Sequence, residues 1–168
     1  MISHKMAERL NDQLNKEFYS AYLYLSISAS CSGNGFNGAA NWFFIQYQEE
    51  NTHALKMFRY LSDQNVDIDL RTISAPELED LSFIGAFKAS LEHEQKMTHQ
   101  LNKLSDYSFQ EKDHATYNFL QWYVTEQVEE EATLNKIIDQ IKIVGDNGHG
   151  LLTIDKELGA RIFVDPTL

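Results

Sequence analysis

The sequence predicts an all-α fold: an antiparallel four-helix bundle with one long crossover and a short fifth helix at its C-terminal end. Leu, Ala, Glu, Gln and Lys recur through the 168 residues, and only two prolines and eight glycines interrupt them, a balance that favours helix. Apolar residues recur at steps of three and four, the period of one helix face. One long segment lacks this period and predicts the crossover.

The first two predicted helices cover residues of about 5–32 and about 37–63. The first carries Met6, Leu10 and Leu14 on one face and ends at the turn Gly33-Asn34-Gly35. Asn37 is the predicted N-cap of the second. Because the turn between them is short, we expect the two helices to lie antiparallel.

The third and fourth predicted helices cover residues of about 82–107 and about 110–144. Ser82 is a suitable N-cap for the third. The fourth ends at the glycine-rich run Gly145-Asp146-Asn147-Gly148. Residues of about 151–160 are expected to form the short fifth helix.

The segment from Gln64 to Leu81 joins the second and third helices without a helical period. About 18 extended residues reach roughly 55 Å, whereas a helix of about 26 residues is only about 39 Å long. The segment can therefore run the full length of the bundle. We interpret residues 1–168 as one domain.

The charge balance is acidic, with 25 Asp and Glu against 14 Lys and Arg, a net charge of −11. This balance disfavours nucleic acid as a partner and favours cations, although acidity alone is also typical of many soluble proteins. A single cysteine, Cys31, excludes an intramolecular disulfide and a Cys-x-x-Cys metal site. No signal core or bilayer-spanning apolar stretch is apparent, so we expect a cytoplasmic protein that binds no membrane.

Polar residues interrupt the apolar face near the middle of every long helix. They are Glu17 in the first, Glu50 and His53 in the second, Glu94 in the third, and Gln127 and Glu130 in the fourth. Buried carboxylates are costly unless they are paired or bound to a cation, and no Lys or Arg occupies these positions. A multivalent metal is the simplest compensation. Glu50 and His53 are three residues apart, so they share a helix face and can hold the same ion.

Each of these residues also has an ordinary structural explanation. A glutamate can be solvated at the edge of a stripe, and a core histidine is often hydrogen-bonded. The joint pattern on four helices favours a metal site instead. Oxygen-rich ligation with one imidazole suits iron better than a closed structural zinc site, with manganese and zinc as alternatives.

The order and spacing of these residues resemble those of the bacterial non-haem ferritins over essentially the whole chain. The matching segments are residues 14–24, 48–53, 92–95, 118–131 and 154–158. The resemblance implies a ferritin-like bundle that acts as a ferroxidase, oxidising Fe(II) with dioxygen or peroxide. It also implies iron storage inside a shell of 24 identical chains, with iron as substrate rather than as a permanent cofactor.

The resemblance further implies the ligands of an iron pair. Glu17, Glu50 and His53 would bind the first iron. Glu50 would bridge to a second iron that Glu94 and Glu130 hold.

Four further residues take roles from the same resemblance, and Tyr24 takes one from its position. Gln127 would lie beside the pair as a hydrogen-bonding group. Tyr24 follows Glu17 on the same predicted helix, where it would hydrogen-bond a ligand or donate an electron, with plain packing as the alternative. A third iron site, which shares Glu130, would be formed by Glu49, Glu126 and Glu129. Without the resemblance, these three residues are typical of a solvated acidic face.

Departures from related families narrow the prediction. Bacterioferritins carry a second Glu-x-x-His on the fourth helix, where this chain has Gln127 and Glu130, and a haem-binding Met on the second, where it has Asn51 and Thr52. We therefore expect no haem. Two other functions stay open, a diiron enzyme that oxidises an organic substrate and a structural bundle that binds no metal.

Overall fold

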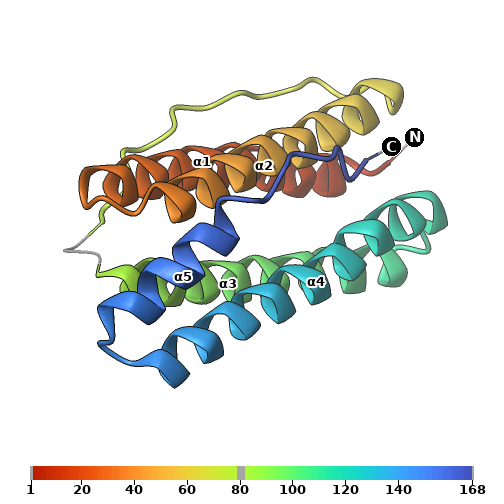
Figure 1. Ribbon diagram of the computed structural model, residues 1–168. Helices are drawn as coiled ribbons and strands as arrows, with labels where there is room; N and C mark the ends of the chain where they lie inside the picture. The colour runs from red at the N-terminus through yellow and green to blue at the C-terminus, as the bar shows by residue number, and fades with distance from the viewer. Residues whose placement is uncertain (1, 79–81, 168) are drawn as a thin grey trace.

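Four long helices pack as two antiparallel pairs, and a fifth crosses one end of the bundle (Figure 1). This computed structural model describes residues 2–78 and 82–167. The helices are α1 (His4–Gly33), α2 (Asn37–Asp63), α3 (Phe83–Gln110), α4 (His114–Val144) and α5 (Gly148–Leu158). Every regular element in the described ranges is helical, which confirms the all-α prediction.

Three polar caps set helix starts. Ser3 Oγ accepts a hydrogen bond from the backbone N of Met6 at 3.2 Å, so α1 begins one residue earlier than predicted. Ser82 Oγ accepts from Gly85 N at 3.1 Å, which confirms the predicted N-cap of α3. Asn147 caps α5, which therefore occupies Gly148–Leu158 rather than about 151–160. None of the helices in the described ranges is both long enough and apolar enough to span a membrane.

The boundary between α3 and α4 differs from the prediction. α3 continues to Gln110, where the fourth helix was predicted to begin. Lys112 then adopts a positive φ of 58°, which no helix accommodates. Asp113 Oδ1 accepts from Thr116 N at 3.1 Å, and this cap places the start of α4 at His114.

The predicted cap of α2 was also wrong. Asn37 is the first helical residue, and Phe36 precedes it without a side-chain cap. Asp155 of α5 supplies the cap instead, accepting from Gly38 N at 3.1 Å and from Ala39 N at 2.8 Å. A Cβ on Gly38 would lie 1.6 Å from the Asp155 carbonyl oxygen, so only glycine allows this close approach.

The core divides into two apolar clusters. One lies toward α5 and contains Tyr24, Phe43 and Phe87, and the other contains Leu14 and Leu120. Between them, on all four long helices, lies a layer of buried polar side chains. Its members are Gln13, Glu17, Gln46, Glu50, His53, Glu94, Gln127 and Glu130. The fold therefore surrounds a polar middle with two apolar ends.

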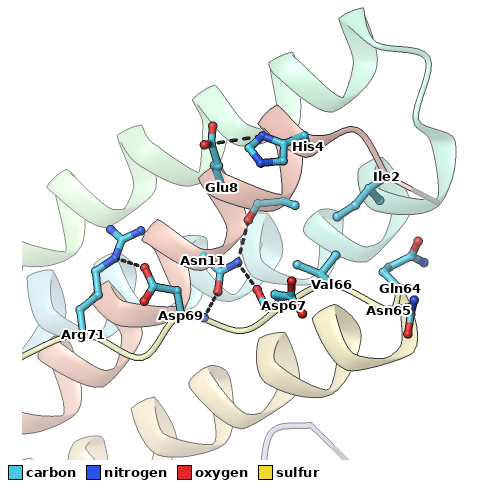
Figure 2. A pocket seen from close by; sticks show the side chains of 11 residues that line it. Ile2, His4, Glu8, Asn11, Gln64, Asn65, Val66, Asp67, Asp69 and Arg71 are labelled. Carbon is cyan, nitrogen blue, oxygen red and sulfur yellow. Dashed lines mark hydrogen bonds and ion pairs between the residues drawn. The ribbon is translucent and has the colours of Figure 1, made fainter.

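The crossover is extended, as predicted, and runs along the α1–α2 pair (Figure 1). Asn11 on α1 donates to the Asp67 carbonyl at 3.1 Å and accepts from Asp69 N at 2.8 Å (Figure 2). Asn15, one turn later, donates to the Asp69 carbonyl at 2.7 Å and accepts from Arg71 N at 2.8 Å. Two side-chain amides thus fix the path of the crossover against α1.

Candidate metal centre

Glu17 of α1 meets Glu50 and His53 of α2 in the buried polar layer. Each residue offers one potential ligand atom, and these atoms all lie within 4.8 Å of one another. Oε2 of Glu50 is 3.6 Å from Nδ1 of His53, one turn along the same helix. Among residues 2–78 and 82–167, this is the one set of three or more His, Cys, Asp or Glu side chains whose potential ligand atoms come within 4.8 Å of one another.

His53 has an unsatisfied ring nitrogen. Its Nε2 is buried without a hydrogen-bond partner, and its Nδ1 faces Glu50 at a distance too long for a good hydrogen bond. The Tyr123 hydroxyl fixes the local backbone by donating to the His53 carbonyl at 2.7 Å. A buried polar atom without a partner is costly, and imidazole nitrogen is a common metal ligand. The donor set therefore fits a metal ion.

Glu94 and Glu130 extend this site from the opposite helix pair, and neutral groups hold both. The Tyr24 hydroxyl donates to Oε1 of Glu94, and Nε2 of Gln127 donates to Oε2 of Glu94 at 3.0 Å. Nε2 of Gln46 donates to Oε2 of Glu130 at 2.8 Å. We call Glu17, Glu50, His53, Glu94 and Glu130 the central cluster.

No Lys or Arg of the described residues forms an ion pair with the central cluster. Glu17 instead accepts from Nε2 of Gln13 at 2.8 Å. An amide donor satisfies an oxygen atom but does not neutralise its charge. The glutamates consequently lack the compensating cation that buried carboxylates require.

Burial raises the pKa of all four glutamates in the central cluster. For Glu50 and Glu130, repulsion from Glu94 is the next cause and raises the pKa further. Burial also raises the pKa of Tyr24 well above its ordinary value, which keeps its phenolic proton available to Glu94. A multivalent cation would replace this repulsion with shared ligation.

A second acidic cluster adjoins the central one. Glu49, Glu126, Glu129 and the shared Glu130 line a cavity of about 250 Å³, together with Arg161 and residues of the C-terminal segment. Burial raises the pKa of Glu49 and of Glu126, and the Arg161 charge opposes that rise for Glu49. The structure therefore places the four glutamates that the resemblance assigned to a third site around one cavity, although they do not approach one another as closely as Glu17, Glu50 and His53 do. We call them the second cluster.

Comparison with known proteins places the chain in a family. Residues 7–144 match the Ferritin-like domain family. A bacterial non-heme ferritin of Campylobacter jejuni is 41% identical over 156 residues, covering 93% of each chain. The chain belongs to the ferritin-like family.

Further ferritins share the sequence and the fold. A bacterial non-heme ferritin of Staphylococcus aureus is 39% identical over 163 residues, covering 97% of this chain and 98% of the relative. An open pore ferritin from the hyperthermophilic archaeon Archaeoglobus fulgidus superposes with a TM-score of 0.94 at 45% identity, covering 96% and 99% of the two chains. An engineered closed form of that ferritin gives a TM-score of 0.95, with 98% and 100% covered. These matches confirm the predicted ferritin-like bundle with its fifth helix.

Sequence reasoning missed Gln13, which donates to Glu17, and two residues that link the central cluster to the C-terminal segment. Gln46 was not singled out, although an amide at a core position is itself a sign of a buried hydrogen bond. Arg161 lies beyond α5 and 112 residues from Glu49, its ion-pair partner, and no periodic pattern points to this contact. Both residues connect the central cluster to the C-terminal segment.

Proposed function

We propose that this ferritin-like chain oxidises Fe(II) with dioxygen or peroxide at the central cluster and stores the ferric product. One observation carries the proposal. Four buried glutamates and a histidine with an unsatisfied ring nitrogen converge from four helices, without a Lys or Arg of the described residues to neutralise them. The relatives that are named bacterial non-heme ferritins support this activity.

The central cluster suits two iron ions as substrate. Glu17, Glu50 and His53 would bind one, and Glu50 would bridge to another at Glu94 and Glu130. The repulsion among Glu50, Glu94 and Glu130 supports a second iron position beside the first. One divalent ion does not supply enough positive charge to balance these carboxylates together with Glu17. Each Fe(II) gives one electron, so a pair reduces one dioxygen, with two protons, to hydrogen peroxide. Hard carboxylate oxygens favour the ferric product.

Tyr24 and Gln127 position Glu94 in this proposal. Both donate hydrogen bonds to its carboxylate, and both are neutral, so neither competes with iron by charge. Tyr24 retains its proton because burial raises its pKa. Such outer hydrogen bonds orient a ligand before the ion arrives.

The second cluster would bind a third iron through Glu49, Glu126, Glu129 and Glu130. We propose that the chain is a single domain that assembles into a cytoplasmic shell of 24 copies and binds no haem. The net charge of −11 per chain supports a shell that attracts Fe(II) and retains a ferric mineral.

The test starts from metal-free protein. Fe(II) is added without oxygen, oxygen is then admitted, and ferric absorbance and particle size are followed together. The parent is expected to oxidise many Fe(II) ions per chain inside a particle of constant size. His53→Ala should slow the initial oxidation at least about tenfold, whereas His99→Ala, which alters an exposed histidine, should not.

Two outcomes would support the other functions. An iron pair that survives desalting and turns over without mineral growth would indicate an enzyme with a resident diiron cofactor. A particle that binds no iron and leaves the rate of oxidation at that of free Fe(II) would indicate a structural bundle. Either result would overturn the storage proposal.

A further inference from the structure

The segment after α5 returns along the bundle beside α2 (Figure 1). Nδ2 of Asn41 donates to the backbone carbonyls of Gly159 at 3.4 Å and Arg161 at 3.0 Å. The Arg161 guanidinium lies over the ring of Trp42, 4.6 Å from its centroid. We call residues 159–167 the C-terminal strap. The contacts of Gly159 and Arg161 anchor the beginning of this strap to α2.

Arg161 points from the strap to two acceptors. Its Nη1 donates to Oε1 of Gln46 at 2.5 Å, and its Nη2 donates to Oε2 of Glu49 at 2.5 Å. Arginine can only donate, so Gln46 must present its oxygen to Arg161 and its nitrogen to Glu130, 2.8 Å away. A continuous path of hydrogen bonds thus joins the strap to a glutamate of the central cluster.

The same guanidinium borders the cavity in which the second cluster is proposed to bind a metal ion. It contacts Glu49 and lines the cavity of about 250 Å³ that Glu126, Glu129 and Glu130 also line. Val164 and Pro166 of the strap also line it, as does Thr133 of α4. Arg161 already supplies a positive charge to the Glu49 carboxylate. A metal ion in the same cavity would be repelled by that charge, so metal and guanidinium compete to neutralise the same glutamates.

We propose that Arg161 is an internal counter-cation of the second cluster, which a third metal ion must displace, thereby releasing the C-terminal strap. Displacement also frees Oε1 of Gln46, the partner of Glu130. Occupation of the second cluster therefore reaches the central cluster by two routes, directly through the shared Glu130 and indirectly through the Gln46 amide. This inference rests on the third site proposed above.

The first measurement is calorimetric titration of the metal-free, fully assembled protein with Zn(II), which does not oxidise. Arg161→Gln should bind the third Zn(II) about tenfold more tightly, because the competing charge-assisted bond is gone. Arg9→Gln is the matched control: it removes one positive charge and an arginine 4.3 Å from the ring of Tyr107, away from both clusters. The affinity of Arg9→Gln for the third Zn(II) ion should equal that of the parent.

The second measurement is hydrogen exchange of the peptide that contains residues 159–167. In the parent, exchange should accelerate when the third Zn(II) binds. Glu49→Gln should accelerate it without metal, because Arg161 loses its ionic partner. Glu8→Gln, which alters an exposed glutamate at the start of α1, should leave the strap unchanged.

Two results would overturn this inference while leaving the ferroxidase proposal intact. One is an equal affinity for the third Zn(II) ion in the parent and Arg161→Gln. The other is hydrogen exchange of residues 159–167 that Zn(II) does not alter. Failure of the first two Zn(II) ions to bind would overturn the ferroxidase proposal itself. If Arg161→Gln does not fold, the exchange measurement on the parent alone decides, because it needs no variant.

Discussion

Gln127 on α4 holds Glu94 on α3 at two points. Its Nε2 donates to the backbone carbonyl of Glu94 at 3.1 Å and to the carboxylate at 3.0 Å. One amide therefore fixes both the main chain and the ligand oxygen across the helix pair. The orientation of Glu94 is set before any metal binds.

Gln127→Leu tests this relationship. The variant should weaken binding of the second Zn(II) by about 10-fold to 100-fold, because Glu94 loses the bond that orients it. Gln121→Leu is the control, since Gln121 also reaches from α4 to α3, donating to Ser105 Oγ at 2.9 Å away from the clusters. Titration of both variants with Zn(II) should show the loss for Gln127 alone; equal affinities would contradict the assigned role.

Acidification should stabilise the metal-free protein between about pH 7 and pH 5. Glu17, Glu50, Glu94 and Glu130 have folded-state pKa values above their unfolded values, so the folded state binds more protons in this window, and stability falls as pH rises. His93 has the opposite effect. Burial lowers its pKa from 6.5 to about 4, so the folded state loses stability as the pH falls through this range. The four glutamates together are expected to outweigh this single histidine, so the net effect of acidification is stabilising.

Urea unfolding across this pH range measures the effect. Glu50→Gln should flatten the pH dependence and raise the free energy of unfolding at pH 7, because it removes one repelling charge. The Zn(II)-bound parent should show the opposite trend, since protons displace the metal. A metal-free parent that loses stability steadily from pH 7 to pH 5 would contradict the assignment.

The second cluster should control the later course of iron oxidation. Glu49→Ala with Glu126→Ala should leave two ions bound per chain and preserve the first fast oxidation, while changing the number of Fe(II) consumed per dioxygen. Anaerobic Fe(II) titration followed by oxygen uptake provides both quantities. A double variant identical to the parent in iron count, stoichiometry and recovery of activity would make this cluster an ordinary acidic surface.

The docking of α5 should depend on Gly38. Gly38→Ala places a Cβ 1.6 Å from the Asp155 carbonyl oxygen, so α5 must shift and α2 loses its cap. We expect the free energy of unfolding to fall by roughly 1–3 kcal/mol. Gly33→Ala, which meets no atom within 4 Å, should instead raise it by about 0.4–1 kcal/mol. Thermal unfolding of both variants checks the contrast, and a neutral Gly38→Ala would show that α5 docks loosely.

Most of the fold could be predicted because the apolar period is strong in each long helix. The exceptions are local. Near the end of α3 the buried face carries Ser105 and Ser108, so the apolar period faded near Tyr107 although the helix continues to Gln110. Asn37 looked like a cap, but Asp155, distant in sequence, satisfies those backbone groups.

The candidate site could be predicted in composition but not in its connections. Glu17 and Glu94 stood out because a carboxylate on a core stripe conflicts with its surroundings. Gln13 and Arg161 caused no such conflict, since one is an amide and the other lies outside any periodic segment. Contacts between groups distant in sequence come from tertiary packing, which a single sequence does not record.

The hydrogen bonds of Asn11 and Asn15 to the crossover affect which of its residues can change during evolution. The hydrogen bonds of Asn11 and Asn15 to the crossover all involve its peptide groups, so they specify its path without specifying its side chains. Leu70 and Ile73 are 62% and 42% exposed, and the two asparagines do not bond to their side chains. Because α1 holds the crossover by its peptide groups, the outward-facing residues of the crossover can change during evolution while its position in the bundle stays constant.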